Sequence, residues 1–428
     1  MSGKSHGISR ELFTAIARGG GGSAAMRELA AAQHSKHLIL LRAVLEAAHP
    51  ATRPDDRLAA AGYDLMARAQ RENPSAAQMV ISYPSVGAWS LHTIRSDQIV
   101  PGAQPSALAA VGAAAAIRAG VDAEIEVPVT AGQVILPSLG AAAAEGSTAL
   151  VRTAAGEIRS GSLRVIMRPG ADGWRELRTI QAGSLDVIVD DLDPFRMPAT
   201  DGQPTGRLTQ AEAAELADMV NAAWQVMDPA SAAEIAALIK VIVPYSAPDS
   251  GLVSTSSPQT FGTVAMSRQP NPYTCAETLL HEAHHIKLSA LLDLVSLCKP
   301  DDGQRYYAPW RDDPRPASGL LQGAYAFLGV SGFWRGQQAS APEPEVRQRA
   351  AAEFARWRDG AALVCDTLLS SGQLTGDGLE FTGEMARVLA AWQREPVAAD
   401  ALAVAHAKAD RHATQWQADN GVMPPARG

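Results

Sequence analysis

One stretch of this 428-residue chain constrains its fold and chemistry more than any other. Between Thr278 and Val295, apolar residues recur at helical spacing, and neither Gly nor Pro interrupts them. This pattern predicts one largely buried helix. Inside it, an HExxH motif runs from His281 to His285 and places two imidazoles one turn apart on the same helix face. Two histidines so placed can close on a single metal ion.

A helix with several histidines can also be an ordinary core helix whose polar groups are satisfied. The apolar setting favours the metal site, because His281, His284 and His285 are costly to bury without partners. His281 and His285, four residues apart, make a better pair than His281 and His284. Glu282 lies about 100° further round the helix, near the ion without having to bind it. From these residues alone, HExxH predicts a zinc peptidase with Glu282 as the base that activates a metal-bound water.

The composition excludes several other classes of protein. The chain is 46% hydrophobic and 19% charged, with a net charge of -8, which argues against a nucleic-acid partner. The three cysteines, Cys275, Cys298 and Cys365, are widely spaced and suggest buried thiols rather than a disulfide framework. No apolar signal region opens the chain, and no run approaches the roughly 20 apolar residues of a membrane span. We therefore expect a cytoplasmic protein without a membrane partner.

The fold class expected is α+β, with helical regions at both ends of the chain around a short-stranded sheet. Residues 1–120 are predicted to be helical, with a connection between Pro74 and Pro84. Residues 121–195 form a β-rich region punctuated by glycines. Its expected strands are 125–129, 133–136, 149–152, 163–166, 176–180 and 185–189. An acidic cluster at its end, Asp190, Asp191 and Asp193, suggests either a cation site or a solvated strand end.

Residues 207–335 are expected to form the catalytic core, and residues 336–428 a helical C-terminal region with separate helices at 344–359 and 361–370. Strands are predicted at 240–244 and 261–267, the second about a dozen residues before the HExxH helix. A strand just before such a helix is typical of zincin-like folds, where its exposed edge pairs with an extended peptide over the metal. A peptide substrate is therefore expected.

The core region also resembles a known family. The residues that carry the resemblance are Phe261-Gly-Thr-Val-Ala-Met, the HExxH helix, Tyr307-Ala-Pro-Trp-Arg-Asp-Asp-Pro-Arg-Pro and Gly319-Leu-Leu-Gln-Gly-Ala-Tyr. Together they are similar to the HExxH-motif peptide-modification proteins, which are regarded as iron- and 2-oxoglutarate-dependent β-hydroxylases in pathways to ribosomally made peptide natural products. The similarity covers about residues 250–335.

The resemblance implies a different chemistry from that of a peptidase. It implies an oxygenase that uses Fe(II) and 2-oxoglutarate to hydroxylate a Cβ position of a precursor peptide. Such a site needs two histidines and usually one carboxylate, with positions left for cosubstrate and O2. The alternatives are a zinc metallopeptidase and a non-catalytic module that recognises a peptide. Under the oxygenase hypothesis, Glu282 orients a water or an imidazole instead of acting as the base.

The remaining site residues are less constrained by the sequence. The third metal ligand is expected to be Asp313, its neighbour Asp312, or Gln322, which stands where gluzincin peptidases have a glutamate. The distal carboxylate of 2-oxoglutarate calls for a guanidinium, and Arg311 and Arg315 are the nearest in sequence, with Tyr307 as a hydroxyl donor. Arg268 and Arg335 are further candidates for the same role. Alternatively, Arg311 and Arg315 simply form salt bridges with the two aspartates.

Overall fold

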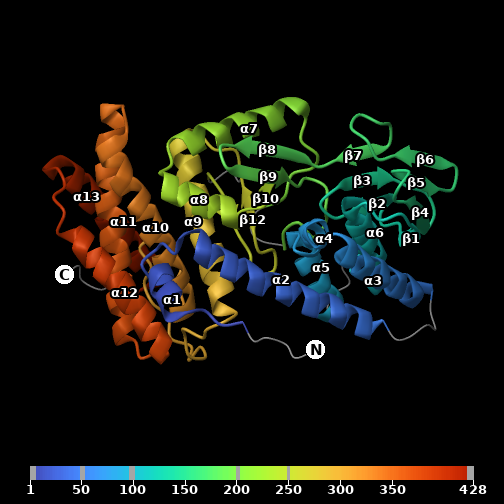
Figure 1. Ribbon diagram of the computed structural model, residues 1–428. Coiled ribbons are helices and arrows are strands. Elements are labelled where there is room, and N and C mark those ends of the chain that lie inside the picture. The colour runs from blue at the N-terminus through green and yellow to red at the C-terminus, as the bar shows by residue number, and fades with distance from the viewer. Residues whose placement is uncertain (1–5, 49–53, 96–101, 199–202, 248–250, 422–428) are drawn as a thin grey trace.

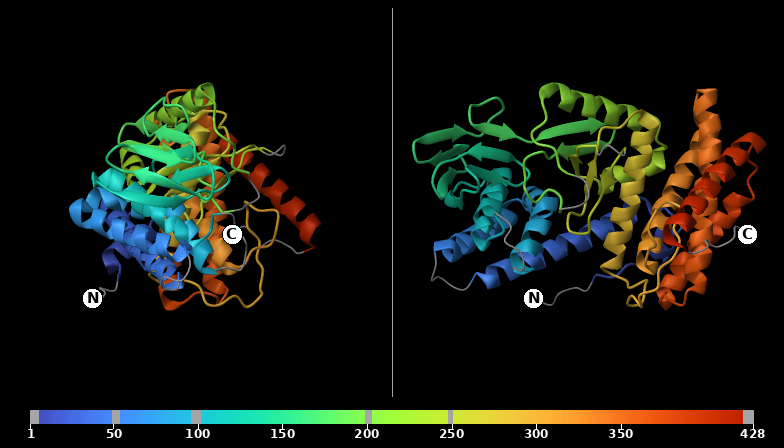
Figure 2. Two further views of the ribbon diagram at one scale, coloured as in Figure 1. Left: turned by 90° about the vertical axis from the view of Figure 1, so that its right-hand side faces the viewer. Right: turned by 180° about the vertical axis from the view of Figure 1, so that it is seen from behind.

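The computed structural model describes residues 6–48, 54–95, 102–198, 203–247 and 251–421. It has the expected mixed α+β architecture, in which helices predominate (Figure 1). The strands β1–β7 lie at one end of the molecule and the helices α10–α13 at the other, with a five-stranded sheet and α9 between them (Figures 1 and 2). None of the described helices is both long enough and apolar enough to cross a membrane.

The N-terminal region is helical, as predicted. Its helices are α1 (Arg10–Ala17), α2 (Gly22–Ala47), α3 (Pro54–Glu72), α4 (Pro74–Ile81), α5 (Pro84–Arg95) and α6 (Leu108–Ala119). The connection predicted between Pro74 and Pro84 is wrong, because α4 occupies most of it. Pro74 begins this helix rather than breaking it, and the Asn73 side chain accepts a hydrogen bond from the Ala76 amide as a cap.

The β-rich region contains two small antiparallel sheets. One has the order β1-β4-β5-β6 and the other β2-β3-β7. Their strands are β1 (Glu124–Pro128), β2 (Gln133–Leu136), β3 (Gly140–Ala143), β4 (Thr148–Arg152), β5 (Glu157–Ser160), β6 (Leu163–Ile166) and β7 (Trp174–Glu176). Strands β3 and β5 were not predicted, and the single strand expected at 176–180 is wrong, because β7 ends at Glu176 and β8 begins at Arg178. β3 has the sequence Gly-Ala-Ala-Ala, which has no β-branched residue to signal a strand.

A five-stranded sheet of order β11-β12-β10-β9-β8 forms the centre of the molecule. Its strands are β8 (Arg178–Ala182), β9 (Leu185–Val189), β10 (Val241–Pro244), β11 (Ser254–Thr255) and β12 (Thr263–Met266). β9, β10 and β12 are parallel, and antiparallel strands complete both sides. The sheet therefore joins strands from the β-rich region and from the expected catalytic core in one hydrogen-bonded layer.

The predicted strands at 240–244 and 261–267 are present as β10 and β12, and every residue of both is buried. β12 lies between β10 and β11, so it has hydrogen-bonded neighbours on both sides. The expectation of an exposed edge on this strand is therefore wrong. Among the described strands, the short strand β11 forms the edge of the sheet on the side of β12.

Two helices, α7 (Gln210–Gln225) and α8 (Pro229–Leu238), lie beside the central sheet (Figure 1). The predicted HExxH helix is α9 (Pro272–Leu292), which begins with an Asn271 cap and a proline in its first turn. It is followed by α10 (Ala317–Ser340), α11 (Pro344–Ser370), α12 (Gly376–Gln393) and α13 (Ala399–Asn420). The two separate helices expected at 344–359 and 361–370 are wrong: α11 continues through the buried Gly360, which packs against Pro309.

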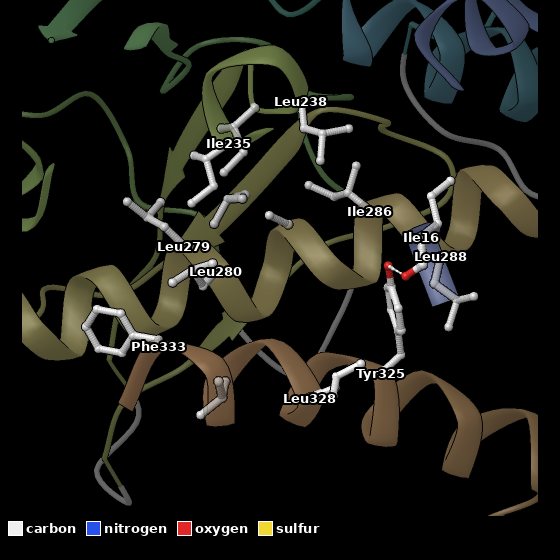
Figure 3. Close-up of a cluster of buried hydrophobic side chains, with 14 of the residues drawn as sticks. Ile16, Ile235, Leu238, Leu279, Leu280, Ile286, Leu288, Tyr325, Leu328 and Phe333 are labelled. Carbon is white, nitrogen blue, oxygen red and sulfur yellow. Dashed lines mark hydrogen bonds between the residues drawn. The ribbon is translucent and has the colours of Figure 1, made fainter. Parts of the chain in front are cut away.

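Helix α9 runs through the larger of two hydrophobic clusters and packs on α10. Figure 3 shows Tyr325 of α10 reaching past α9 to Ile16 of α1, where its hydroxyl donates to the backbone carbonyl at 2.8 Å. The close approach of α9 and α10 depends on glycine. A Cβ at Gly329 would lie 2.3 Å from the ring of His284, and one at Gly323 would lie 2.4 Å from Trp310. The glycines of α10 thus let two aromatic rings lie against its backbone.

Candidate functional site

The two imidazoles of the HExxH motif face each other on α9. The Nε2 atoms of His281 and His285 lie 3.1 Å apart, with the ring planes at 76°. Two nitrogen ligands about 2.1 Å from one ion, at right angles, would be roughly 3.0 Å apart. The spacing therefore fits two adjacent positions around a single metal ion.

The electrostatics of the pair also suit metal binding. Desolvation by burial, and secondarily the neighbouring His285, hold the pKa of His281 well below its ordinary value, so this imidazole is neutral near pH 7. On the other ring, His285 Nδ1–H donates to the Oε1 atom of Gln322 at 3.1 Å, which leaves the Nε2 lone pair pointing at His281. Gln322 Nε2 in turn donates to the Ser289 hydroxyl at 3.4 Å. A metal ion binds an imidazole through the lone pair of the nitrogen that faces it, and the Gln322 contact sets this tautomer for His285.

The third histidine of the motif has a structural role. His284 Nδ1–H donates to the Leu280 carbonyl at 2.9 Å, and its Nε2 lies 3.2 Å from the Gly19 carbonyl. Burial lowers the pKa of this ring to about 3. Beside it, the buried Lys287 donates to the carbonyls of Gly19 and Gly20 and pairs with Glu234 at 2.9 Å. Both side chains therefore hold the segment after α1 against α9, away from the imidazole pair.

Glu282, the acidic residue of the motif, is fixed by two serines. Only 2% of it is exposed, and its Oε1 and Oε2 atoms accept hydrogen bonds from Ser254 and Ser256, each at 2.7 Å. Ser254 belongs to β11 and Ser256 follows that strand. The carboxylate therefore joins α9 to the edge of the central sheet.

The loop predicted to supply the third ligand and the cosubstrate arginines forms its own ion pairs. Arg311 Nε and Arg315 Nη1 donate to the two carboxylate oxygens of Asp313, each at 2.9 Å. Asp313 is about half exposed, at 49% of its side chain, and Asp312 is almost fully exposed. Salt bridges of both arginines are thus present, but both are made with Asp313 and not with the two aspartates as expected.

The other two predicted residues lie near the ends of this loop. Gln322 contacts Nδ1 of His285, on the side of the ring away from the nitrogen that faces His281. The Tyr307 hydroxyl lies 2.9 Å from Nδ1 of His412 on α13, and its ring packs edge-on against Trp416. Within the described part of the chain, no group of three His, Cys, Asp or Glu side chains is arranged to hold a metal ion. The candidate for metal binding in this region is therefore a pair of imidazoles, with no third such side chain arranged beside it among the described residues.

Two sets of residues at the site were not singled out from the sequence. The first is Ser254 and Ser256, whose link to Glu282 crosses more than 25 residues of chain. The second is an aromatic group on three elements: Phe327 contacts His281 and lies between Trp310 and Trp357. The density of aromatic residues between Arg305 and Arg335 is a sequence signal for Trp310 and Phe327, but Trp357 lies outside that stretch.

The acidic cluster at the end of β9 is neither solvated nor open, because all three carboxylates are buried. Asp191 is paired with two arginines, at 207 and 178. Tyr83 and Ser85, at the start of α5, donate to Asp190 and Asp193 respectively, each at 2.7 Å. Burial, and then the neighbouring Asp190, raise the pKa of Asp193 to about 7. The expected solvated strand end is therefore wrong: the cluster joins the N-terminal helices to the sheet.

Comparison with known proteins gives no family for this chain. No protein-family model matches it, and no curated protein matches it at a significant level.

Proposed function

We propose that this chain is an iron(II)- and 2-oxoglutarate-dependent oxygenase that hydroxylates a Cβ position of a ribosomally made precursor peptide. The observation that carries the proposal is the pair of Nε2 atoms, on His281 and His285, that lie 3.1 Å apart on α9. The similarity of residues 250–335 to the HExxH-motif peptide-modification proteins supports the choice of iron over zinc.

In this proposal His281 and His285 hold the ion through Nε2. Bound Fe(II), with 2-oxoglutarate and O2, supplies the oxidising power for attack on an unactivated C–H bond. Gln322 is a positioning residue, because it accepts the Nδ1 proton of His285 and so sets the tautomer and orientation of that ring. Gln322 binds the far nitrogen of His285 and Asp313 binds two arginines, so the protein donors assigned to the ion are the two imidazoles.

A peptide substrate is supported by the strand beside the motif. β11 has one strand neighbour among the described residues, and it carries Ser254, which binds Glu282. In this zincin-like arrangement, an extended peptide pairs with the backbone of β11, because this edge of the sheet lies next to the HExxH helix α9. Glu282 then keeps this edge in register with the imidazoles.

A zinc peptidase is the second candidate, since HExxH is its signature. In that mechanism Glu282 must take a proton from a metal-bound water. Here both of its oxygens already accept hydrogen bonds from serines, which favours a positioning role. Replacing Glu282 by Gln should therefore abolish peptidase activity but leave part of an oxygenase activity.

The test begins with metal binding under anaerobic conditions. Fe(II) should bind wild-type protein at one site per chain, and His281→Ala or His285→Ala should each abolish this binding. The exposed His406 of α13 gives a matched control, because His406→Ala should bind Fe(II) like the wild type. Fe(II) binding that survives His281→Ala would contradict the proposal.

Activity then separates the three functional hypotheses. Under O2, the iron-loaded protein should convert 2-oxoglutarate to succinate, and a precursor peptide should gain one oxygen atom by mass. Peptide cleavage with zinc would support the peptidase instead. Binding of a peptide with neither change would support a non-catalytic recognition module.

A further inference from the structure

An aromatic wall continues from the imidazole pair to helix α11. The ring of Phe327 lies 5.1 Å from that of His281, measured between centroids, and 4.3 Å from that of Trp357. On its other side Phe327 stacks on Trp310 at 4.6 Å. The Phe327, Trp310 and Trp357 side chains are only half-buried although they pack against the main hydrophobic core. This aromatic wall is therefore a surface that a ligand at the imidazole pair can touch.

Arg356 stands at the far end of the aromatic wall. Its guanidinium lies 4.0 Å from the centroid of the Trp357 ring. Stacking of this kind fixes the plane of a guanidinium and leaves its N–H groups directed outward from the edge. The side chain is 22% exposed, so solvent and ligands can reach it. Trp357 thus holds a cation in place beside the candidate site.

The hydrogen-bonding capacity of Arg356 is largely unused. Its nearest carboxylate oxygen is Oε2 of Glu353, 4.0 Å from Nη1 and beyond hydrogen-bond distance. Glu353 already accepts a hydrogen bond from Lys408 at 2.5 Å. Across the described ranges, no hydrogen bond joins the Arg356 guanidinium to another residue. A half-buried guanidinium with five N–H donors therefore has room for an anionic partner.

The surrounding charges do not neutralise this cation fully. Glu277, one turn before His281 on α9, also interacts with Arg356. Burial raises the pKa of Glu277 to about 7, so that carboxyl group is only partly ionised near neutral pH. Arg411 of α13 adds a second positive charge that acts on Arg356. Burial also lowers the pKa of Arg356 itself, the direction expected for a cation with too little compensating charge.

The arginines expected from the sequence to bind a carboxylate are all occupied. Arg311 and Arg315 share Asp313. Arg268 pairs with Glu215 at 3.1 Å, and Arg335 Nε donates to both oxygens of Glu395. Each of the four would have to give up a carboxylate before it could bind another. Arg356 would not.

We infer that Arg356, stacked on Trp357, forms a carboxylate-binding subsite for the ligand of the His281–His285 pair. The guanidinium holds a carboxylate group through charge-assisted hydrogen bonds, while the rest of the ligand lies along Phe327 towards the imidazoles. The carboxylate belongs either to a free dicarboxylic acid or to an acidic residue of a peptide. The catalytic role of this subsite rests on the proposed function, but its affinity for a carboxylate does not.

The test uses the full-length protein and two probes that need no metal. Glutarate represents a free dicarboxylate and lacks the 2-oxo group with which a ligand could chelate iron. The blocked peptide acetyl-Gly-Gly-Asp-Gly-Gly-amide represents an acidic residue in a chain. Binding is measured by calorimetry and by tryptophan fluorescence, which should respond because Trp357 lies at the subsite. Binding of glutarate alone assigns the subsite to a free acid, and binding of the peptide alone assigns it to the substrate.

The variants are chosen to separate loss of charge from loss of fold. Arg356→Met should weaken binding of the preferred probe at least about tenfold, and Arg356→Lys should weaken it less, because the charge remains. Arg349→Met is the matched control, since Arg349 stacks on Trp334 from the same helix two turns earlier. It should bind like the wild type. Unchanged thermal unfolding of the three variants would show that the fold is intact.

Three results would overturn the subsite: wild-type affinity in Arg356→Met, loss of binding confined to Arg349→Met, or no binding of either probe to wild-type protein. These outcomes are distinct from failure of the proposed function. If glutarate binding depends on Arg356 but the iron-loaded protein forms no succinate, the subsite stands and the oxygenase proposal fails.

Discussion

The close packing of α10 on α9 leads to a prediction with a calculable size. In Gly329→Ala, the new methyl group would lie 2.3 Å from Cε1 and 2.5 Å from Nδ1 of His284. Neither partner can yield easily, because His284 is held between the carbonyls of Leu280 and Gly19 and both helices lie in the core. Either α10 moves away from α9 or His284 leaves its hydrogen bonds.

The expected cost follows from three contributions. Overpacking of this severity costs about 3 kcal/mol, at the upper end of the usual range. Loss of a buried hydrogen bond adds about 1 kcal/mol, and the better helix propensity of alanine returns about 1 kcal/mol. The net destabilisation should be roughly 3 kcal/mol. Urea unfolding of the variant and the wild type, followed by circular dichroism, measures it.

The same helix provides the control. A Cβ at the exposed Gly336 would meet nothing within 4 Å, so Gly336→Ala should stabilise the protein by about 0.5–1 kcal/mol through helix propensity alone. The two substitutions are chemically identical but should act in opposite directions. A Gly329→Ala protein as stable as the wild type would refute the packing of α10 on His284.

Three further predictions concern polar groups in the core. Replacing Ser254 and Ser256 together by alanine removes both donors to buried Glu282 and should cost roughly 3 kcal/mol or more in urea unfolding; a cost below about 1 kcal/mol would argue against this contact. Lys287→Met should cost about 3 kcal/mol, since it breaks a buried ion pair, whereas Lys299→Met on the surface should cost little. Because the pKa of Asp193 is raised in the fold, its stabilising contribution is complete below about pH 4 and is lost as pH rises towards 7. Asp193→Asn should therefore lose less stability than the wild type between pH 5 and pH 8; equal losses would contradict the shift.

Much of the fold was accessible from the sequence, because burial leaves a periodic trace. The helical repeat around His281 predicted α9, and runs of apolar residues predicted β10 and β12. The errors have physical causes. Pro74 does not mark a break, because proline suits the first turn of a helix. β3 was missed because small residues buried between two strands carry no strand signal of their own.

The candidate site was accessible only in part. Two histidines four residues apart fix their own geometry, and they face each other as the motif requires. Nearness along the chain was a poor guide to everything else. Arg311 and Arg315 flank Asp313 and pair with it, whereas Arg356 reaches the site only through the packing of α10 on α11. Such placements depend on tertiary structure, which local spacing does not encode.

The contacts that α9 and α10 make with the end of α1 and the two glycines after it limit how this protein can be truncated. A fragment starting at residue 207 would keep the HExxH helix but lose the backbone oxygens of Ile16, Gly19 and Gly20. Lys287 would keep Glu234 and His284 would keep the Leu280 carbonyl, but each would lose a hydrogen-bond partner in an apolar interior. The Tyr325 hydroxyl would lose its acceptor at Ile16. The region around the HExxH helix is thus assembled from distant parts of the chain, and a shortened version for crystallisation or engineering must retain α1 and the two glycines that follow it.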